Sequence, residues 1–428
     1  MEGNLLTTIL ALVVYLSTSI FGGGNEDATP HEVTNPPTTQ AQQSEAPNTA
    51  SVTTDLVNMR AENSTNSKTV SVLKKGDIVS IVAEKDGWYQ VKSKSGETGW
   101  LAKWAVKPGY FVLPSGGNGL EILGYYAESY KGDTRGLSSF TGNIDKISMI
   151  APFSYRVDQN GKISGSANSQ VMKAAKTKNV QTLAVVTNIN GSNFSRETVS
   201  KLLRSSSARA RAISGILRII RENGYSGVNI DFEGVPVKDR SYLTTFFREL
   251  SAALRPHNLL VTAALPAKTA AEEWSSWSGA FDYKALSSYL DLAVIMTYDQ
   301  HQAAGPAGPV ASQGWVESVL KYSLQYFSPN RLIMGLATYG YEWNERTGRA
   351  LNYASIESII KKYSISPKWH DQYQTPYFTY TKSGNEYEVW YENQNSTAAK
   401  MRLVEKYKIR GVAIWRLGYE DPRIWSVL

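Results

Sequence analysis

Gly227-Val228-Asn229-Ile230-Asp231-Phe232-Glu233 alternates apolar and polar side chains, and this stretch decides how the fold is interpreted. The alternation predicts a β-strand with Asn229, Asp231 and Glu233 on one face. Polar residues in a buried strand need partners, because an unpaired buried carboxylate is very costly. Two carboxyl groups this close do not both ionise easily, so one should keep its proton near neutral pH. Glu233 is therefore our candidate for a catalytic acid, and the alternative is a pair of strand-end carboxylates that cap loops.

Seven further apolar runs accompany this stretch between residues 119 and 428, and helical patterns separate them. The expected strands are Glu121–Tyr126, Lys146–Ala151, Thr182–Thr187, Gly227–Phe232, Leu260–Leu265, Leu292–Thr297, Leu332–Ala337 and Gly411–Trp415. The expected helices include Arg196–Asn223 and Ser241–Leu254. This alternation predicts an α/β fold, a (β/α)8 TIM barrel with its active site at the C-terminal ends of the strands. An alternating aromatic patch from Thr375 to Tyr391 predicts a small β insertion between strands seven and eight.

The N-terminal part of the chain divides into four segments. Residues 1–21 contain an apolar run, residues 5–21, that suits a signal peptide or a membrane anchor, although Glu2 precedes it and no Lys or Arg does. Residues 22–54 are rich in Gly, Pro, Thr, Ser and Asn and predict a disordered linker. Short β-type runs in residues 55–107 predict a small all-β barrel, and residues 108–118 form a second linker.

The composition excludes several classes of protein. With 42% hydrophobic and 19% charged residues, the chain is globular rather than wholly disordered. It contains no Cys, and its four His are far apart, so we expect no metal ion and no cofactor. The net charge of +7 without a dense Lys/Arg block fits an anionic surface such as a bacterial cell wall, and nucleic acid is not an expected partner.

Residues 55–107 resemble the bacterial SH3-type domain. The resemblance rests on Val57-Asn58-Met59-Arg60, Lys75-Gly76-Asp77, Gly87-Trp88-Tyr89-Gln90-Val91 and Gly99-Trp100-Leu101. In bacteria this module often attaches enzymes to peptidoglycan, so the resemblance implies binding to the cell wall. The alternative is that the module only packs against the enzyme.

Residues 119–428 resemble glycoside hydrolase family 18, whose signature on the fourth barrel strand is DxxDxDxE. The four acidic positions are occupied by Ser226, Asn229, Asp231 and Glu233, so the last two match and the first two differ. Further matches to the family are Met296-Thr297-Tyr298-Asp299 on the sixth strand, Gly124-Tyr125-Tyr126 on the first and Trp415 on the eighth.

Several stretches are similar to the spore-germination branch of the family, which degrades cortex peptidoglycan. They are Leu265-Pro266-Ala267-Lys268, Tyr298-Asp299-Gln300-His301 with Gly308-Pro309-Val310, and Val389-Trp390-Tyr391-Glu392. That branch usually has Asn where other members carry the second Asp. The resemblance therefore makes Asn229 a feature of the subfamily rather than a sign of lost activity.

The resemblance implies a retaining, substrate-assisted glycosidase that cuts β-1,4 bonds of N-acetylglucosamine-containing glycan. Glu233 would protonate the leaving oxygen, Asp231 would orient the acetamido nitrogen, and Tyr298 would hydrogen-bond the acetamido oxygen. Catalytic support is expected from Asn229 and Asp299, and substrate binding from Tyr125, Met296, Gln300 and Trp415.

Two alternatives stay open, a chitinase with the same machinery and a catalytically silent glycan-binding barrel in which Ser226 and Asn229 mark lost function. We expect a monomer, secreted or associated with the cell wall or spore, whose membrane contact is limited to residues 5–21. Trp274 and Trp277, after the fifth strand, are candidates to line a sugar cleft.

Overall fold

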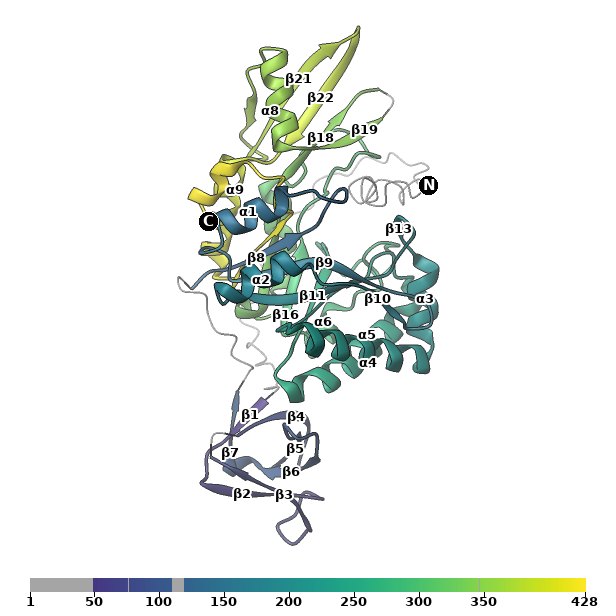
Figure 1. Ribbon diagram of the computed structural model, residues 1–428, viewed down its shortest axis with the longest axis vertical. Coiled ribbons are helices and arrows are strands. Elements are labelled where there is room, and N and C mark those ends of the chain that lie inside the picture. Colours follow the sequence, from purple (N-terminus) through teal and green to yellow (C-terminus); the bar gives the residue numbers. More distant parts are fainter. Residues whose placement is uncertain (1–48, 76, 110–118, 346) are drawn as a thin grey trace, which may run out of the picture.

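The computed structural model describes residues 49–75, 77–109, 119–345 and 347–428 (Figure 1). The expected signal or anchor segment and nearly all of both linkers lie outside these residues. Within the described ranges, none of the helices combines the length and apolar character needed to cross a bilayer.

Seven short strands form the antiparallel small β-domain, in the order β3-β2-β6-β5-β4-β1-β7. They are β1 (Thr49–Val52), β2 (Leu56–Arg60), β3 (Thr69–Lys74), β4 (Ile78–Lys85), β5 (Trp88–Lys92), β6 (Thr98–Ala102) and β7 (Val106–Gly109). This sheet confirms the predicted SH3-like part of the fold. The strand β1 lies in the stretch that we had assigned to the first linker. It forms because its backbone pairs with β4 and β7, and because Ala50 and Val52 are buried in the domain core.

Eight parallel strands close into a barrel and confirm the predicted TIM-barrel fold. They are β8 (Glu121–Tyr126), β9 (Met149–Val157), β11 (Gln181–Thr187), β14 (Gly227–Asp231), β15 (Leu260–Pro266), β16 (Leu292–Met296), β17 (Leu332–Ala337) and β23 (Gly411–Trp415). A short strand, β10 (Ile163–Gly165), extends β9 as an antiparallel hairpin. Apolar side chains such as Leu123, Val185 and Val294 fill the barrel interior. Most predicted strands agree with the structure within one residue, whereas β9 starts and ends later than expected.

The helices are α1 (Arg135–Gly142), α2 (Ser169–Thr177), α3 (Arg196–Arg204), α4 (Ser206–Asn223), α5 (Arg240–Leu254), α6 (Tyr283–Leu286), α7 (Gln313–Ser323), α8 (Tyr353–Lys362) and α9 (Gln394–Tyr407). All of them except α8 cover the barrel and pack on its strands through a large apolar core, whereas α8 packs on the insertion sheet. The single helix that we expected over Arg196–Asn223 is wrong, because the chain breaks at Ser205. This residue is extended, and its hydroxyl accepts a hydrogen bond from the Ala208 amide, so it caps a new helix.

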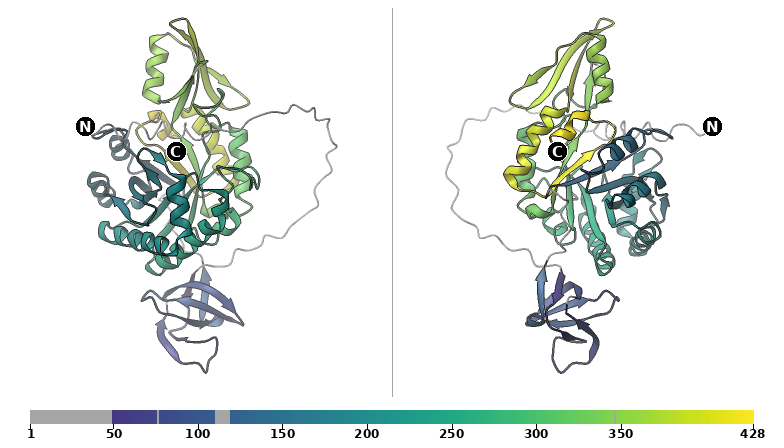
Figure 2. Two further views of the ribbon diagram at one scale, coloured as in Figure 1. Left: turned by 90° about the vertical axis from the view of Figure 1, so that its right-hand side faces the viewer. Right: turned by 60° about the vertical axis from the view of Figure 1, so that its left-hand side comes forward.

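An insertion sheet with the helix α8 stands between β17 and β23 and projects from one end of the molecule (Figures 1 and 2). Its strands, in the order β19-β18-β22-β21-β20, are β18 (Tyr339–Trp343), β19 (Gly348–Asn352), β20 (Lys368–His370), β21 (Thr375–Lys382) and β22 (Asn385–Tyr391). The aromatic patch that we had noted forms only the hairpin of β21 and β22. The insertion is larger than expected because it also contains β18, β19 and β20. These strands were not predicted, since each is short and lies outside the aromatic patch. The small β-domain lies at the opposite end of the molecule (Figure 2).

Candidate active site

The C-terminal ends of β14 and β16 bring four of the expected site residues together. Asp231 ends β14 and Glu233 follows it, while Tyr298 and Asp299 follow β16. The charges of Asp231 and Asp299 both act on Glu233, and those of all three carboxyl groups act on the phenol of Tyr298. Tyr125, on β8, lies close to Asp231 and Tyr298. The structure therefore gathers these five side chains at the mouth of the barrel.

The missing cation partners set Asp231 and Glu233 apart from the other buried acids. Nine Asp and Glu residues are buried in the described part of the chain, and seven of them form an ion pair with Arg or Lys. These seven are Glu121, Asp133, Asp239, Asp291, Glu342, Glu392 and Asp421. Asp231 and Glu233, which are 6% and 8% exposed, form none. Burial without a cation makes the charged form of a carboxyl group costly, so such an acid tends to hold its proton.

The carboxyl groups of Asp231 and Glu233 therefore favour their neutral forms. Burial raises the pKa of both side chains, and it is the largest cause in each case. The charges of Asp231 and Asp299 raise the pKa of Glu233 further. The raised pKa makes Glu233 hold its proton more readily than a free carboxyl group does. A general acid requires this direction of shift.

Asp299 is held by two tyrosines of the insertion sheet. The hydroxyls of Tyr339 and Tyr341, both on β18, donate to Asp299 Oδ1 at 2.5 and 2.8 Å. Burial raises the pKa of Asp299 to about 6, although the two phenol hydrogen bonds oppose that rise. The backbone of Asp299 has a φ of +59°, which is uncommon for a residue other than glycine and is frequent at functional sites. We missed these tyrosines, whose only sequence signal is their spacing of two just after the seventh strand.

Asn229 lies inside the barrel and is fully buried. Its Oδ1 accepts a hydrogen bond from the hydroxyl of Tyr125 at 3.0 Å, and its Nδ2 donates to Thr262 Oγ1 at 2.8 Å. We expected Asn229 to support Asp231, but its hydrogen bonds to described residues go to Tyr125 and Thr262 instead. Asn229 thus fixes the phenol of Tyr125 at the site.

Asn188, which sequence reasoning missed, holds the backbone of Glu233 from both sides. The Glu233 amide donates to Asn188 Oδ1, and Asn188 Nδ2 donates to the Glu233 carbonyl oxygen, both at 2.9 Å. Asn188 directly follows β11, is fully buried and also donates to the carbonyl oxygen of Ser195. Its position after a barrel strand is a signal that could have been used, since such positions line the catalytic face.

Aromatic side chains form one wall of the site. Trp415, half-buried at the end of β23, packs edge-on against Tyr125 with ring centroids 5.6 Å apart and contacts Phe153 at 5.5 Å. Tyr298 passes over Gly335 on β17, where a Cβ atom would lie 2.8 Å from Tyr298 Cε1. A side chain at residue 335 would therefore displace the phenol of Tyr298.

The remaining two expected residues lie next to this group. Met296 is the last residue of β16 and is 9% exposed. Gln300 Oε1 accepts a hydrogen bond from the amide of Ser312 at 2.9 Å, so this side chain holds the loop after β16. Substrate binding by Met296 and Gln300 stays a prediction. Within the described ranges, no group of three His, Asp or Glu residues has an arrangement that could hold a metal ion.

Comparisons with known proteins agree with this geometry. Residues 121–420 match the family described as Glycosyl hydrolases family 18, and residues 55–107 match the bacterial SH3 domain. The chain is 31% identical over 303 residues to the uncharacterized glycosylase YvbX of Bacillus subtilis, covering 69% of this chain and 88% of YvbX. It is 28% identical over 289 residues to the cortical fragment-lytic enzyme of the same organism, covering 66% and 67% of the two chains. Among solved structures it is similar to a chitinase from Chromobacterium violaceum, with 27% identity, a TM-score of 0.67 and 72% and 97% coverage.

Proposed function

Because the chain belongs to glycosyl hydrolases family 18 it is a glycosidase, and we propose that it cuts β-1,4 bonds of N-acetylglucosamine-containing glycan in peptidoglycan or spore-cortex fragments. The observation that carries this proposal is the pair of buried carboxyl groups at the mouth of the barrel, Asp231 and Glu233, which form no ion pair with any described residue. The similarity to a cortical fragment-lytic enzyme supports the choice of glycan.

The position of the two carboxyl groups supports substrate assistance. A retaining enzyme with its own nucleophile holds two carboxyl groups about 5 Å apart on opposite sides of the scissile bond. Asp231 ends β14 and Glu233 follows two residues later at the same strand end, so both approach the substrate from the same side. The nucleophile then has to come from the substrate, and the oxygen of a 2-acetamido group can supply it.

Each side chain has a role in this mechanism. The neutral Glu233 protonates the leaving oxygen while the acetamido oxygen attacks the anomeric carbon. Asp231 orients the acetamido nitrogen and Tyr298 donates to the acetamido oxygen, while Trp415 supports the sugar ring. Glu233, now ionised, takes a proton from the water that opens the cyclic intermediate. Two displacements at the same carbon retain its configuration.

The experiment that tests the proposal compares the wild type with Glu233→Gln on muropeptides and N-acetylglucosamine oligomers. The rate of the variant should fall by roughly 10²–10⁴, because the amide cannot deliver a proton. A de-N-acetylated oligomer should not be cut by either protein. Equal product release by wild type and variant would support the silent glycan-binding barrel instead.

A chitinase is the second candidate function, and the similarity to the solved chitinase favours it. Mass spectrometry of the products released from intact cortex peptidoglycan and from chitin separates the two. Muropeptide products with little soluble chitin fragment would support the peptidoglycan reading, and the reverse pattern would support a chitinase.

The small β-domain is proposed to bind the cell wall, since residues 55–107 match the bacterial SH3 domain. Deleting residues 50–107 should release the protein into the supernatant when purified wall is sedimented. Full sedimentation of the truncated protein would contradict this role. A secreted, wall-associated or spore-associated location and a monomeric state stay predictions.

A further inference from the structure

Two tryptophans are exposed on the catalytic face of the barrel, in the loop between β15 and α6. Trp274 is 84% exposed, more than any other large hydrophobic side chain in the part of the chain that the structure describes, and Trp277 is 37% exposed. An indole left in water forgoes the stabilisation of burial, and two such rings three positions apart on one loop offer an apolar surface to a ligand. The loop follows the C-terminal end of β15, the side of the barrel on which Glu233 lies.

The loop presents these rings on a fixed backbone. Ser275 Oγ accepts hydrogen bonds from the amides of Trp277 and Ser278 at 3.3 and 3.1 Å, and the Gly279 amide donates to the Ser275 carbonyl oxygen. Gly279 makes the turn possible, because a Cβ there would lie 2.6 Å from that oxygen. The exposure of Trp274 is therefore built into a compact turn.

An arginine joins this loop to the segment that carries Glu233. Arg240 is the first residue of α5, only seven positions after Glu233, and its guanidinium pairs with Glu273 and Asp282 at 3.2 and 3.0 Å. It also donates to the carbonyl oxygen of Gly279 at 3.1 Å. Trp274, the neighbour of Glu273, thus lies on the loop that borders the Glu233 side of the barrel mouth.

The order of the strands around the barrel indicates which part of a bound glycan would lie over this loop. The strand β23, which carries Trp415, is four strands from β14 in either direction around the barrel, so Trp415 and Glu233 stand on opposite sides. A sugar that rests on Trp415 has its leaving oxygen on the Glu233 side, because Glu233 protonates that oxygen. The leaving part of the chain then continues outward over the loops that follow β14 and β15.

We propose that Trp274, together with Trp277 three residues later in the same loop, forms a binding subsite for a sugar ring on the leaving side of the cut bond. This inference rests on the proposed function and names the place where the enzyme binds the leaving part of the glycan. A flat apolar indole face suits the C–H face of a sugar ring and does not depend on charge. The subsite would therefore accept a neutral N-acetylhexosamine as well as one that carries an acidic substituent.

The test compares Trp274→Ala with the wild type on two soluble substrates. One is a hexamer of N-acetylglucosamine, and the other is an aryl glycoside of its dimer, whose leaving group carries no sugar. We expect kcat/KM for the hexamer to fall about three- to tenfold, in the range of a single aromatic contact. The value for the aryl glycoside should not change. Tyr242→Ala, which removes a 40% exposed aromatic side chain from α5, is the control and should change neither value.

Equal losses on both substrates, or no loss on either, would overturn the subsite. Calorimetric binding of the hexamer to Glu233→Gln, with and without Trp274→Ala, separates this inference from the proposed function. Weaker binding in the double variant supports the subsite even when the wild type cuts neither substrate, whereas unchanged binding overturns it.

Discussion

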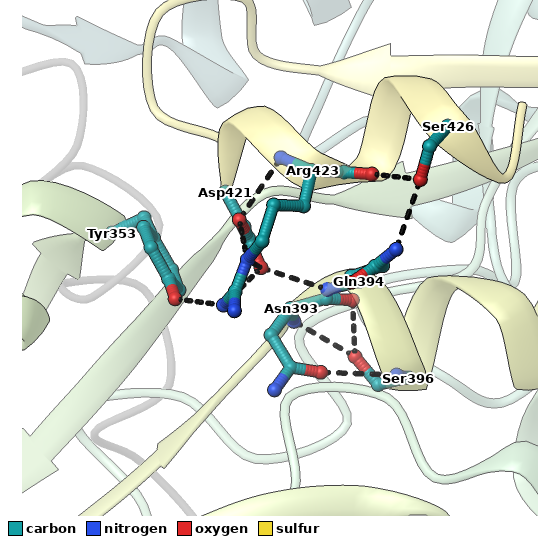
Figure 3. A network of polar contacts seen from close by, with 7 residues as sticks. All are labelled: Tyr353, Asn393, Gln394, Ser396, Asp421, Arg423 and Ser426. Atoms are coloured by element: carbon teal, nitrogen blue, oxygen red, sulfur yellow. Dashed lines mark hydrogen bonds and ion pairs between the residues drawn. The ribbon is translucent and has the colours of Figure 1, made fainter.

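Asp421 and Glu233 are both buried carboxyl groups in the same domain, yet their surroundings give them opposite chemistry. Asp421, 1% exposed, accepts hydrogen bonds from the guanidinium of Arg423 at 2.9 Å and from the amides of Arg423 and Gln394 at 3.0 Å (Figure 3). These donors hold its pKa below the ordinary value in spite of burial. Glu233 has no cation partner in the part of the chain that the structure describes and has two acidic neighbours, and its pKa is raised. Burial by itself therefore says little about function, whereas burial without compensation indicates a group that exchanges protons.

The largest effect should come from Glu233→Gln. Besides the loss of rate, we expect its thermal midpoint at neutral pH to rise or stay constant. A carboxyl group whose pKa is raised by folding costs stability as the pH rises, and the neutral amide removes that cost. Thermal unfolding at pH 7.5 checks this point. A clear fall in the midpoint would place Glu233 with the structural carboxylates.

Glu392→Gln should have the opposite effect to Glu233→Gln. The catalytic rate should stay nearly unchanged, whereas the free energy of unfolding should fall. Glu392 pairs with Lys400 at 2.7 Å, and both side chains are at most 3% exposed. Removing one partner leaves a buried ammonium group, which costs about 3–5 kcal/mol of stability. Urea unfolding measures this loss, and kcat of the folded variant should stay within about twofold of the wild type.

The double variant Glu392→Gln with Lys400→Met serves as the control for this prediction, because it removes the unpaired charge. It should recover most of the lost stability. A double variant as unstable as the single one would show that packing, rather than charge, decides the loss.

Asp299→Asn should change how stability depends on pH. Folding raises the pKa of Asp299 from 3.8 to about 6, so the wild type loses stability as the pH rises between these values. At about 1.36 kcal/mol per pKa unit the total loss approaches about 3 kcal/mol. Unfolding of both proteins at pH 4 and pH 7.5 should show a smaller pH-dependent decline in the variant. Equal declines would mean that the two phenols fully compensate the carboxylate.

Asn188→Ala should produce the smallest of these effects. The variant loses two hydrogen bonds to the Glu233 backbone, and buried groups left unsatisfied cost about 1–3 kcal/mol. We expect kcat to fall about tenfold and KM to change little, because the acid is misplaced while the sugar contacts remain. The alkaline limb of the pH–rate profile should shift, which a purely structural loss would not cause.

The sequence by itself determined where most barrel strands begin and end and which of their side chains share one face. Glu121–Tyr126, Leu332–Ala337 and Gly411–Trp415 were predicted to the residue, because an apolar run between turn residues is a local property. The spacing of Asn229, Asp231 and Glu233 placed all three on one face for the same reason. The break at Ser205 was missed because a helical pattern continues on both sides of it.

Only the tertiary structure decided which side chains meet. Tyr125 and Asn229 are 104 positions apart, Asp299 and Tyr339 are 40 apart, and Asn188 and Glu233 are 45 apart. Tyr125 and Asn229 meet because the barrel closes β8 onto β9. Asp299 and Tyr339 meet because β18 follows β17, the neighbour of β16, and Asn188 meets Glu233 because β11 pairs with β14. Among the described residues, no Lys or Arg forms an ion pair with Glu233 although the sequence contains 45 of them, and the packing of the strands decides this as well. Local patterns thus define what each strand presents, and the packing of distant strands defines the chemistry that results.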